Sequence, residues 1–202
     1  MRRVIRNGVA VVAIGWLASG VLQRVADAPG VLLAGQRQPG GDAFASGLEV
    51  LQLRPNFYMI AGAGGNIAVQ VGEDGVVVVD AGSAAKADAV VAAIKALWEK
   101  PIRYVINTSS DPDHVGGNEK VAQAGRTLFN VNNPLGEGLT NGGAAAVLAA
   151  EKVLTRMSTP TGQTSPHPAI AWPTETFNGP RNYMFLNGEG IEVLHQPAAH
   201  TD

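Results

Sequence analysis

Four polar side chains that could bind a metal ion lie within six residues of one another. Ser109, Asp111, Asp113 and His114 stand in the stretch N-T-S-S-D-P-D-H-V-G-G-N, residues 107–118. Two carboxylates and an imidazole on one short turn favour a cation between them, and a divalent metal is the simplest candidate. The alternative is a helix N-terminus, with Asp111 or Asp113 as the cap and the other as a partner of the helix dipole.

Two other chemistries are disfavoured by the sequence. The chain has no cysteine, which excludes disulfides, thiolate zinc sites and cysteine nucleophiles within it. Any metal must therefore be held by imidazole and oxygen ligands. A serine nucleophile, Ser109 or Ser110 next to His114, is a minor alternative because neither serine lies in the sharp turn that exposes such a nucleophile.

The polar turn follows an apolar run, residues 102–106, that reads as a buried strand. In α/β folds, ligand-binding groups lie where such strands end. Earlier strands are predicted at 48–53, 57–60, 67–71 and 76–79, with a Gly-rich turn at 61–66 and a hairpin turn at 72–75. A helix with Ser83 as its N-cap is predicted to run to about Glu99, and another begins at Asn118. Antiparallel strands followed by a helical crossover predict a mixed sheet covered by helices.

The second half of the chain is predicted to contain a loop at 126–140 and a Pro-rich loop at 159–173, where His167 reads as a solvated residue. Residues 144–157 fit either one helix or a strand followed by a helix. A short strand is expected at 174–177. A hairpin is expected from 183–186 and 191–194, joined by N-G-E-G.

The N-terminus resembles an export signal. Arg2, Arg3 and Arg6 precede an apolar segment, residues 9–22, that is short for a bilayer-spanning helix. Cleavage after Ala28 or Ala34 and an uncleaved anchor are the alternatives, and a buried N-terminal helix is a further one. We expect residues 1–28 to be a signal peptide or anchor, 29–47 a linker and 48–202 the folded domain. The protein is thus expected to be periplasmic or extracellular, with membrane contact only through this segment.

Composition limits the partners. The 202 residues are 46% hydrophobic and 16% charged, which suits one globular domain with a sizeable core. The formal net charge of −2, without a long run of either sign, argues against a nucleic-acid partner. A small-molecule substrate is the expected partner, and the sequence does not indicate an oligomeric state.

Three separated stretches resemble the metallo-β-lactamase superfamily. They are G-A-G-G-N at 62–66, V-V-V-D-A-G at 77–82 and I-N-T-x-x-x-P-D-H-x-G-G-N at 106–118. The resemblance implies an α/β fold, the αββα sandwich with one or two metal ions at the edge between the sheets. The match begins near residue 48, and the chain is expected to hold about the first two-thirds of such a domain. An incomplete domain would expose a sheet edge and apolar surface and would tend to self-associate.

The resemblance also assigns roles to single residues. The family signature is H-x-H-x-D-H; Asp113 and His114 match its last two ligands, while Ser109 and Asp111 occupy the positions of the two leading histidines. His200, in P-A-A-H-T-D, matches a later metal-binding histidine, and Ala150 replaces a histidine in the segment at 144–157. The implied ligands are Asp111, Asp113, His114 and His200, with Ser109 as a weak or water-mediated one.

Two further residues are expected to support the ligands. Asp80 matches the family's strand-end aspartate, which positions ligands, and Asn118 closes the motif. For Asp80 the alternative is a turn residue that only binds backbone N–H groups. Zinc is the family's usual metal, and the carboxylate of Asp111 would also suit iron or manganese.

The implied function is a metal-dependent hydrolase. Metal-activated hydroxide, oriented by Asp113, would attack an ester, amide or lactam, or thioester-type substrate. The alternative is a degenerate member without catalysis that binds a ligand or partner in the same cleft, and Ser109 and Ala150 in place of histidines motivate it. An ordinary α/β domain with an acidic turn would not explain motif matches at several separated places.

Overall fold

The computed structural model describes residues 47–128, 143–197 and 199. The predicted signal segment and nearly all of the predicted linker lie outside this range, as do most of the predicted loop at 126–140 and His200. In the described part of the chain, no helix is both long and apolar enough to cross a membrane.

A seven-stranded mixed sheet forms the centre of the fold. Its strands follow the order of the chain: the first four are antiparallel, and the last three join in parallel. They are β1 (Glu49–Arg54), β2 (Phe57–Ala63), β3 (Gly65–Gly72), β4 (Gly75–Val79), β5 (Ile102–Ile106), β6 (Ala146–Ala150) and β7 (Glu175–Phe177). The predicted mixed sheet is confirmed. Residues 144–157 form a strand followed by a helix, not one helix.

The predicted Gly-rich turn at 61–66 is much tighter than expected. β2 continues to Ala63 and β3 begins at Gly65, so that only Gly64 separates them. Gly64 has a φ of 108°, a left-handed conformation that favours glycine. The wider turn was wrong because this glycine lets the chain reverse at once and both strands extend.

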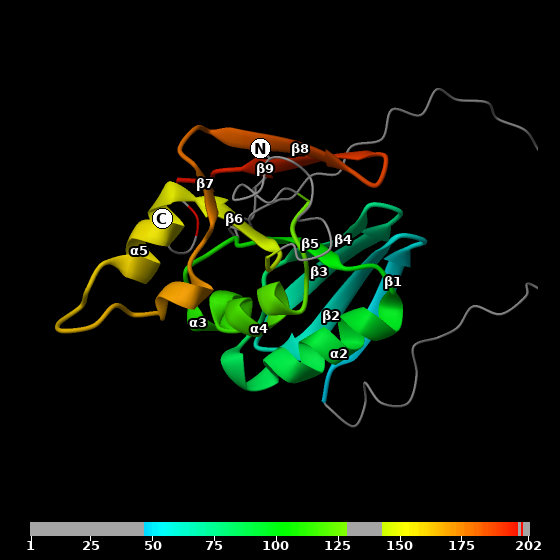
Figure 1. Ribbon diagram of the computed structural model, residues 1–202, viewed down its shortest axis with the longest axis horizontal. Coiled ribbons are helices and arrows are strands. Elements are labelled where there is room, and N and C mark those ends of the chain that lie inside the picture. The colour runs from blue at the N-terminus through cyan, green and yellow to red at the C-terminus, as the bar shows by residue number, and fades with distance from the viewer. Residues whose placement is uncertain (1–46, 129–142, 198, 200–202) are drawn as a thin grey trace, which may run out of the picture.

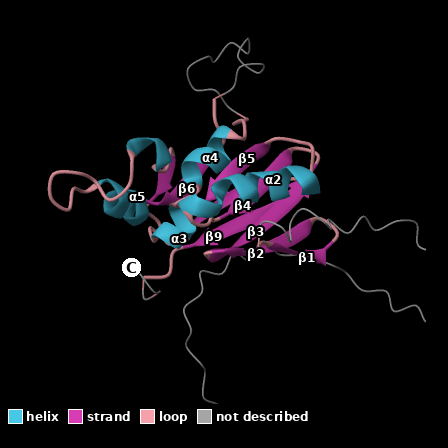
Figure 2. Cartoon of the chain, turned by 90° about the horizontal axis from the view of Figure 1, so that it is seen from below, coloured by secondary structure: helices cyan, strands magenta, loops and turns pink. Residues whose placement is uncertain are grey.

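Helices cover one face of the sheet (Figure 2). Val90 and Ile94 of α2 and Val121 of α4 pack with Val76 and Val78 of β4 in the largest core cluster. These side chains share a cluster because alternate residues of a strand point to the same face. The helical segments are η1 (Ala84–Lys86), α2 (Ala87–Leu97), α3 (Pro112–Val115), α4 (Asn118–Gln123), α5 (Glu151–Ser158) and η2 (Ala169–Ala171).

The first long helical segment begins directly after Ser83, as predicted, and ends close to the predicted limit near Glu99. Ser83 does not cap it with its side chain; the segment starts as the 3₁₀ turn η1, and the Ser83 N–H donates to Ala63 O at 2.7 Å. At the other end, α2 stops at Leu97 instead of Glu99. The backbone of Trp98 is extended, and its indole N–H donates to Gly72 O at 2.9 Å. Contacts from neighbouring strands thus set both limits.

A two-stranded hairpin, β8 (Arg181–Leu186) and β9 (Glu189–Leu194), lies on the opposite face of the sheet (Figure 1). A second core cluster joins the two: Leu186, Ile191 and Val193 pack with sheet residues, among them Val77 and Ile106. The described residues therefore form three layers: helices, sheet and hairpin. The predicted hairpin and the predicted α/β fold class are confirmed.

The tip of this hairpin is tied to the turn between β3 and β4. Asn187 and Gly188 form a two-residue turn with φ values of 56° and 75°, as a tight hairpin with two left-handed residues requires. The N–H of Asn187 donates to Asp74 Oδ2 at 2.7 Å, and the N–H of Asp74 donates to Asn187 Oδ1 at 2.9 Å. Asn187 Nδ2 also donates to Gly75 O at 3.0 Å. These three bonds fix the hairpin tip against the sheet.

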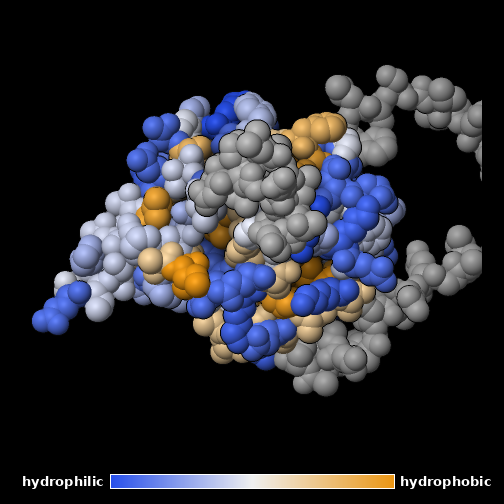
Figure 3. Space-filling model, viewed as in Figure 1, coloured by the Kyte–Doolittle hydropathy of each residue, from blue (hydrophilic) through white to orange (hydrophobic). Residues whose placement is uncertain are grey.

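Some apolar surface remains exposed, and it is scattered. On the face shown in Figure 3, hydrophobic residues form small groups between hydrophilic ones. Among the described residues, Tyr183 and Phe185 are the most exposed large hydrophobic side chains, at 62% and 73%. They alternate along β8 with the half-buried Met184 and the buried Leu186, so they lie on the side of the hairpin away from the sheet.

Candidate metal site at the ends of β4 and β5

The three stretches that carry the family motifs meet at one edge of the sheet. The N–H of Ala81 donates to His114 O at 2.7 Å, and the N–H of Gly117 donates to Gly82 O at 2.9 Å. A Cβ atom on Gly117 would lie 2.2 Å from Ala81 O, and one on Gly64 would lie 3.1 Å from Asp113 Cβ. The motif glycines therefore allow the backbones to approach closely enough to build the site.

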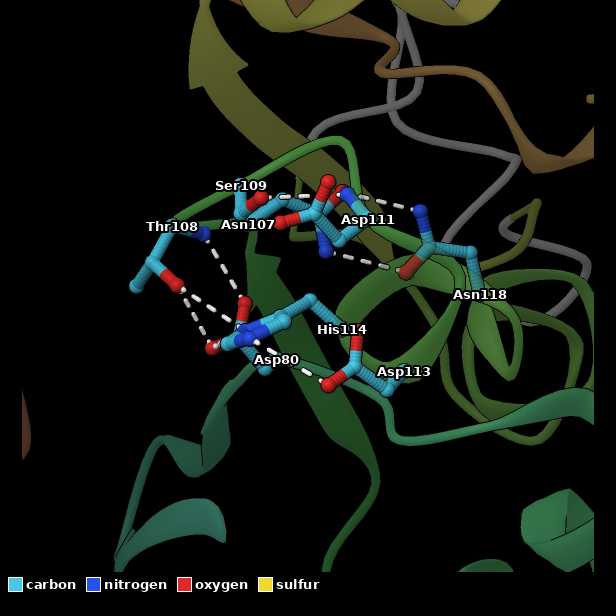
Figure 4. Close-up of polar contacts among 8 residues, drawn as sticks. All are labelled: Asp80, Asn107, Thr108, Ser109, Asp111, Asp113, His114 and Asn118. Atoms are coloured by element: carbon cyan, nitrogen blue, oxygen red, sulfur yellow. Dashed lines mark hydrogen bonds and ion pairs between the residues drawn. The ribbon is translucent and has the colours of Figure 1, made fainter. Parts of the chain in front are cut away.

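Asp80 lies directly after β4 and is 4% exposed. Its φ of 64° is left-handed, a conformation that aspartate tolerates better than most residues. Its carboxylate accepts three hydrogen bonds: Oδ1 accepts the N–H of Thr108 at 2.8 Å, and Oδ2 accepts the Thr108 hydroxyl at 2.6 Å and His114 Nδ1 at 2.8 Å (Figure 4). Asp80 therefore does more than bind the backbone, because it also holds a side chain of the predicted ligand set.

His114 is oriented by this carboxylate. With Nδ1 bound to Asp80, Nε2 is the ring nitrogen left for a ligand, and it lies 3.9 Å from Asp113 Oδ2 (Figure 4). The Asp113 side chain is 52% exposed, so solvent and small molecules can reach it. The hydrogen bond to Asp80 raises the pKa of His114, partial burial opposes this, and the charges of Asp80, Asp113 and Asp111 add to it.

The other half of the turn is closed by a local hydrogen bond. The N–H of Asp111 donates to Ser109 Oγ at 3.0 Å, and Ser109 is 8% exposed. Asp111 is the residue before α3, but its side chain makes no capping hydrogen bond to that helix. The alternative of a helix N-terminus is thus right in position, with Asp111 as the N-cap residue and Asp113 in the first turn, but the Asp111 side chain forms no capping hydrogen bond.

A pair of buried asparagines supports the turn from beneath. Asn107 Nδ2 donates to Asn118 Oδ1 at 3.0 Å, and Asn118 Nδ2 donates to Asn107 Oδ1 at 2.8 Å. Asn118 Nδ2 also donates to Ala171 O at 2.9 Å, which ties η2 to the site. Both residues are at most 3% exposed, and their side-chain amides bind each other through both polar ends.

The structure thus brings Asp80, Asp113, His114 and Asn118 together around one turn. His200 lies outside the described residues. Within residues 47–128 and 143–197, no group of three or more His, Asp or Glu side chains is arranged to hold a metal ion. Two of the predicted ligands in this range lie side by side, with His114 Nε2 3.9 Å from Asp113 Oδ2.

Two residues of the site were not identified from sequence. Thr108 binds both oxygens of Asp80, and Asn107 completes the asparagine pair. Both stand between the end of β5 and Ser109. This position could have identified them, because polar residues directly after such a strand lie at the edge of the sheet where ligands bind. Their partners lie 28 and 11 residues away, and only the folded chain shows these contacts.

Solved structures share this fold. A metallo-β-lactamase of Cronobacter sakazakii with a HARLDQ motif has 17% identity and a TM-score of 0.53, over 74% of this chain and 53% of that one. The class B3 di-zinc metallo-β-lactamase LRA-12 from an Alaskan soil metagenome has 18% identity and a TM-score of 0.55, over 87% and 59%. BJP-1, a subclass B3 metallo-β-lactamase of Bradyrhizobium japonicum, has 18% identity and a TM-score of 0.50, over 73% and 53%.

The chain therefore spans little more than half the length of these three structures. No curated protein matches it. The family model of the metallo-beta-lactamase superfamily matches residues 61–181, which is more than half of the chain. This range includes the tight turn at Gly64, Asp80 and the whole turn from Asn107 to Asn118. The chain belongs to the metallo-beta-lactamase superfamily.

Proposed function

We propose that the protein is a metal-dependent hydrolase that acts on an ester, amide or lactam, or thioester-type small molecule. Asp113, His114, Asp111 and His200 are the proposed ligands, and Asp113 is the proposed catalytic residue. One observation carries the proposal: Asp80 holds Nδ1 of His114, and Nε2 of the same ring lies beside the carboxylate of Asp113.

This pair fits a divalent metal. An imidazole nitrogen and a carboxylate oxygen are common zinc ligands, and a ligating histidine usually donates its other N–H to a carboxylate. The 3.9 Å between Nε2 and Oδ2 leaves room for an ion that contacts both atoms after a small side-chain adjustment. Further oxygen ligation by Asp111 would suit iron or manganese as well as zinc.

A bound divalent ion would supply hydroxide at neutral pH, by lowering the pKa of water, and would polarise the substrate carbonyl. The residues of the chain have separate tasks. His114 is held rigid by Asp80, and the exposed carboxylate of Asp113 accepts a hydrogen bond from the attacking water and so orients it.

Metal analysis of the purified full chain tests the proposal, with Asp113→Ala and His114→Ala as site variants. Asp88→Ala is the matched control, since Asp88 is an exposed carboxylate on α2 that pairs with Lys120. We expect metal in near-integral amount in the wild type and control and its loss in both site variants. Hydrolysis of a chromogenic cephalosporin, a p-nitrophenyl ester and an acyl thioester then separates the substrate classes. Equal metal content in all four proteins would overturn the proposed ligands.

A second candidate is a non-catalytic member that binds a ligand or partner in the same cleft. The hydrogen bond from the N–H of Asp111 to Ser109 favours it, because a serine at a ligand position is used here to close the turn. Absence of tightly bound metal after growth with added zinc, iron and manganese would support this candidate and overturn the hydrolase.

Export is proposed from the sequence of residues 1–28. Three arginines before an apolar segment of limited length are typical of a secretory signal. Cell fractionation with N-terminal sequencing tests this: a periplasmic, secreted or membrane-anchored product supports export, whereas a cytoplasmic protein that begins at Met1 contradicts it.

A further inference from the structure

Thr108 binds Asp80 through two different groups. Its backbone N–H donates to Oδ1 at 2.8 Å, and its hydroxyl donates to Oδ2 at 2.6 Å. A carboxylate held through one oxygen can rotate about the Cβ–Cγ bond, but two bonds from one residue to both oxygens fix its plane. Thr108 is β-branched, which restricts χ1 and limits the directions in which the hydroxyl can point.

The same hydroxyl also faces the imidazole. Thr108 Oγ1 lies 3.3 Å from His114 Nδ1, and Asp80 Oδ2 lies 2.8 Å from it. A carboxylate can only accept, so the hydroxyl hydrogen points to Asp80 and the Thr108 oxygen presents a lone pair to Nδ1. Nδ1 thus faces two acceptors and must carry the ring hydrogen when the imidazole is neutral.

We propose that Thr108 is a positioning residue that sets the tautomer of His114. By fixing the plane of the Asp80 carboxylate and leaving two acceptors at Nδ1, Thr108 keeps the hydrogen on Nδ1 and the lone pair of Nε2 directed beside Asp113. Its consequence for metal binding rests on the proposed function. The tautomer itself does not, because it follows from contacts within the metal-free chain.

Nuclear magnetic resonance of the metal-free full chain tests the tautomer. Long-range ¹H–¹⁵N spectra distinguish protonated from unprotonated ring nitrogens, at a pH high enough for the imidazoles to be neutral. The chain has only four histidines, and His→Gln variants at 167, 195 and 200 assign the signals. We expect His114 to carry its hydrogen on Nδ1 in the wild type.

Two variants of Thr108 separate the hydroxyl from the shape of the side chain. Thr108→Val keeps the size and branching but removes the hydroxyl, and we expect a mixture of both tautomers. Thr108→Ser keeps the hydroxyl, and we expect the wild-type tautomer. Thr176→Val, on the exposed side of β7, is the matched control and should leave the spectrum of His114 unchanged. A single Nδ1–H tautomer in folded Thr108→Val would overturn the proposal.

Zinc affinity, measured by competition with a chromophoric chelator, is the second readout. Loss of the Thr108 hydroxyl should weaken zinc binding by about 10- to 100-fold, with recovery in Thr108→Ser. If Thr108→Val does not fold, Thr108→Ala and Thr108→Ser together serve as the comparison. A tautomer that follows the hydroxyl in a chain that binds no zinc would support the role of Thr108 and reject the proposed function. Tight zinc binding by a chain in which His114 keeps the same tautomer with and without the Thr108 hydroxyl would support the proposed function and reject the role of Thr108.

Discussion

The two halves of the turn between β5 and α4 are held in different ways. His114, in the second half, is fixed by Asp80, which lies 34 residues earlier on another strand end. Ser109 and Asp111, in the first half, are joined by a hydrogen bond that spans two residues. A ligand whose direction is set from outside its own turn keeps its geometry in the absence of metal. We therefore expect His114 to keep its direction before metal binds, since Asp80 holds it from another strand end.

Removal of Asp80 should have the largest effect, because Asp80 holds His114 from outside its own turn. Asp80→Ala removes the carboxylate that accepts hydrogen bonds from the Thr108 N–H, the Thr108 hydroxyl and His114 Nδ1, and we expect a loss of about 2–4 kcal/mol in the free energy of unfolding. Asp111→Ala should cost less, about 1 kcal/mol, because Asp111 is only half-buried and the substitution keeps the backbone N–H that binds Ser109. Urea denaturation of the metal-free proteins measures both, and equal losses would contradict the comparison.

Metal removal tests whether His114, the residue that Asp80 holds in place, binds the metal. At a metal concentration about 100-fold above the dissociation constant, bound metal should stabilise the fold by about 2.7 kcal/mol, or about 5–10 °C in melting temperature. A chelator should remove this increment from the wild type and from the Asp88→Ala control. His114→Ala should have the same melting temperature with and without the chelator. If the chelator still lowers the melting temperature of this variant, the metal binds without His114.

The contribution of the hydrogen-bonded pair Asn107 and Asn118 to stability can be measured by substitution. Asn118→Ala removes three buried hydrogen bonds, and we expect a loss of about 2–3 kcal/mol. Because Asn107 and Asn118 bind each other, the double alanine variant should cost less than the sum of the two single variants by about 1 kcal/mol or more. Additive losses would show that the amides stabilise the turn independently.

The smallest effect is expected at Ser109. Ser109→Ala removes the hydrogen bond that Ser109 Oγ accepts from the N–H of Asp111, and should lower the unfolding free energy by about 0.5–1.5 kcal/mol. The amount of bound metal should not change, since a neutral hydroxyl is a poor ligand. A clear loss of metal in Ser109→Ala would show that the hydroxyl belongs to the metal site. Both halves of the turn would then contribute to metal binding.

Sequence patterns predicted the fold well where local residue types determine it. The valine run of β4, the glycines at 72 and 75 and the N-G-E-G stretch at 187–190 each predicted a local conformation, and the strand and both hairpins are confirmed. The second turn is tighter than predicted, with only Asn187 and Gly188 between β8 and β9. Boundaries set by distant contacts were not predictable in this way. The backbone after α2 is extended where the Trp98 indole meets Gly72 O, and Ser83, at the predicted N-cap position, makes no side-chain cap bond and donates its N–H to Ala63 O.

The same distinction applies to the candidate site. The ligand set Asp111, Asp113, His114 and His200 came from motif resemblance and stays a prediction. The contact between Asp80 and His114 and the part played by Thr108 required the folded chain, since the pairing of two strand ends cannot be read from spacing alone. Chemistry placed on one turn is visible in a sequence, whereas the residues that orient it come from elsewhere in the fold.

The tie between the hairpin tip and the sheet also bears on chemical ageing of the protein. Asn-Gly is a sequence prone to deamidation, in which the following backbone nitrogen attacks the asparagine side chain. In Asn187 both side-chain polar atoms are engaged, with Asp74 and Gly75, so the folded state should slow this reaction. If it occurs, a carboxylate replaces the amide beside the carboxylate of Asp74, and like charges then face each other. Spontaneous damage at one residue would thus loosen the hairpin from the sheet over time.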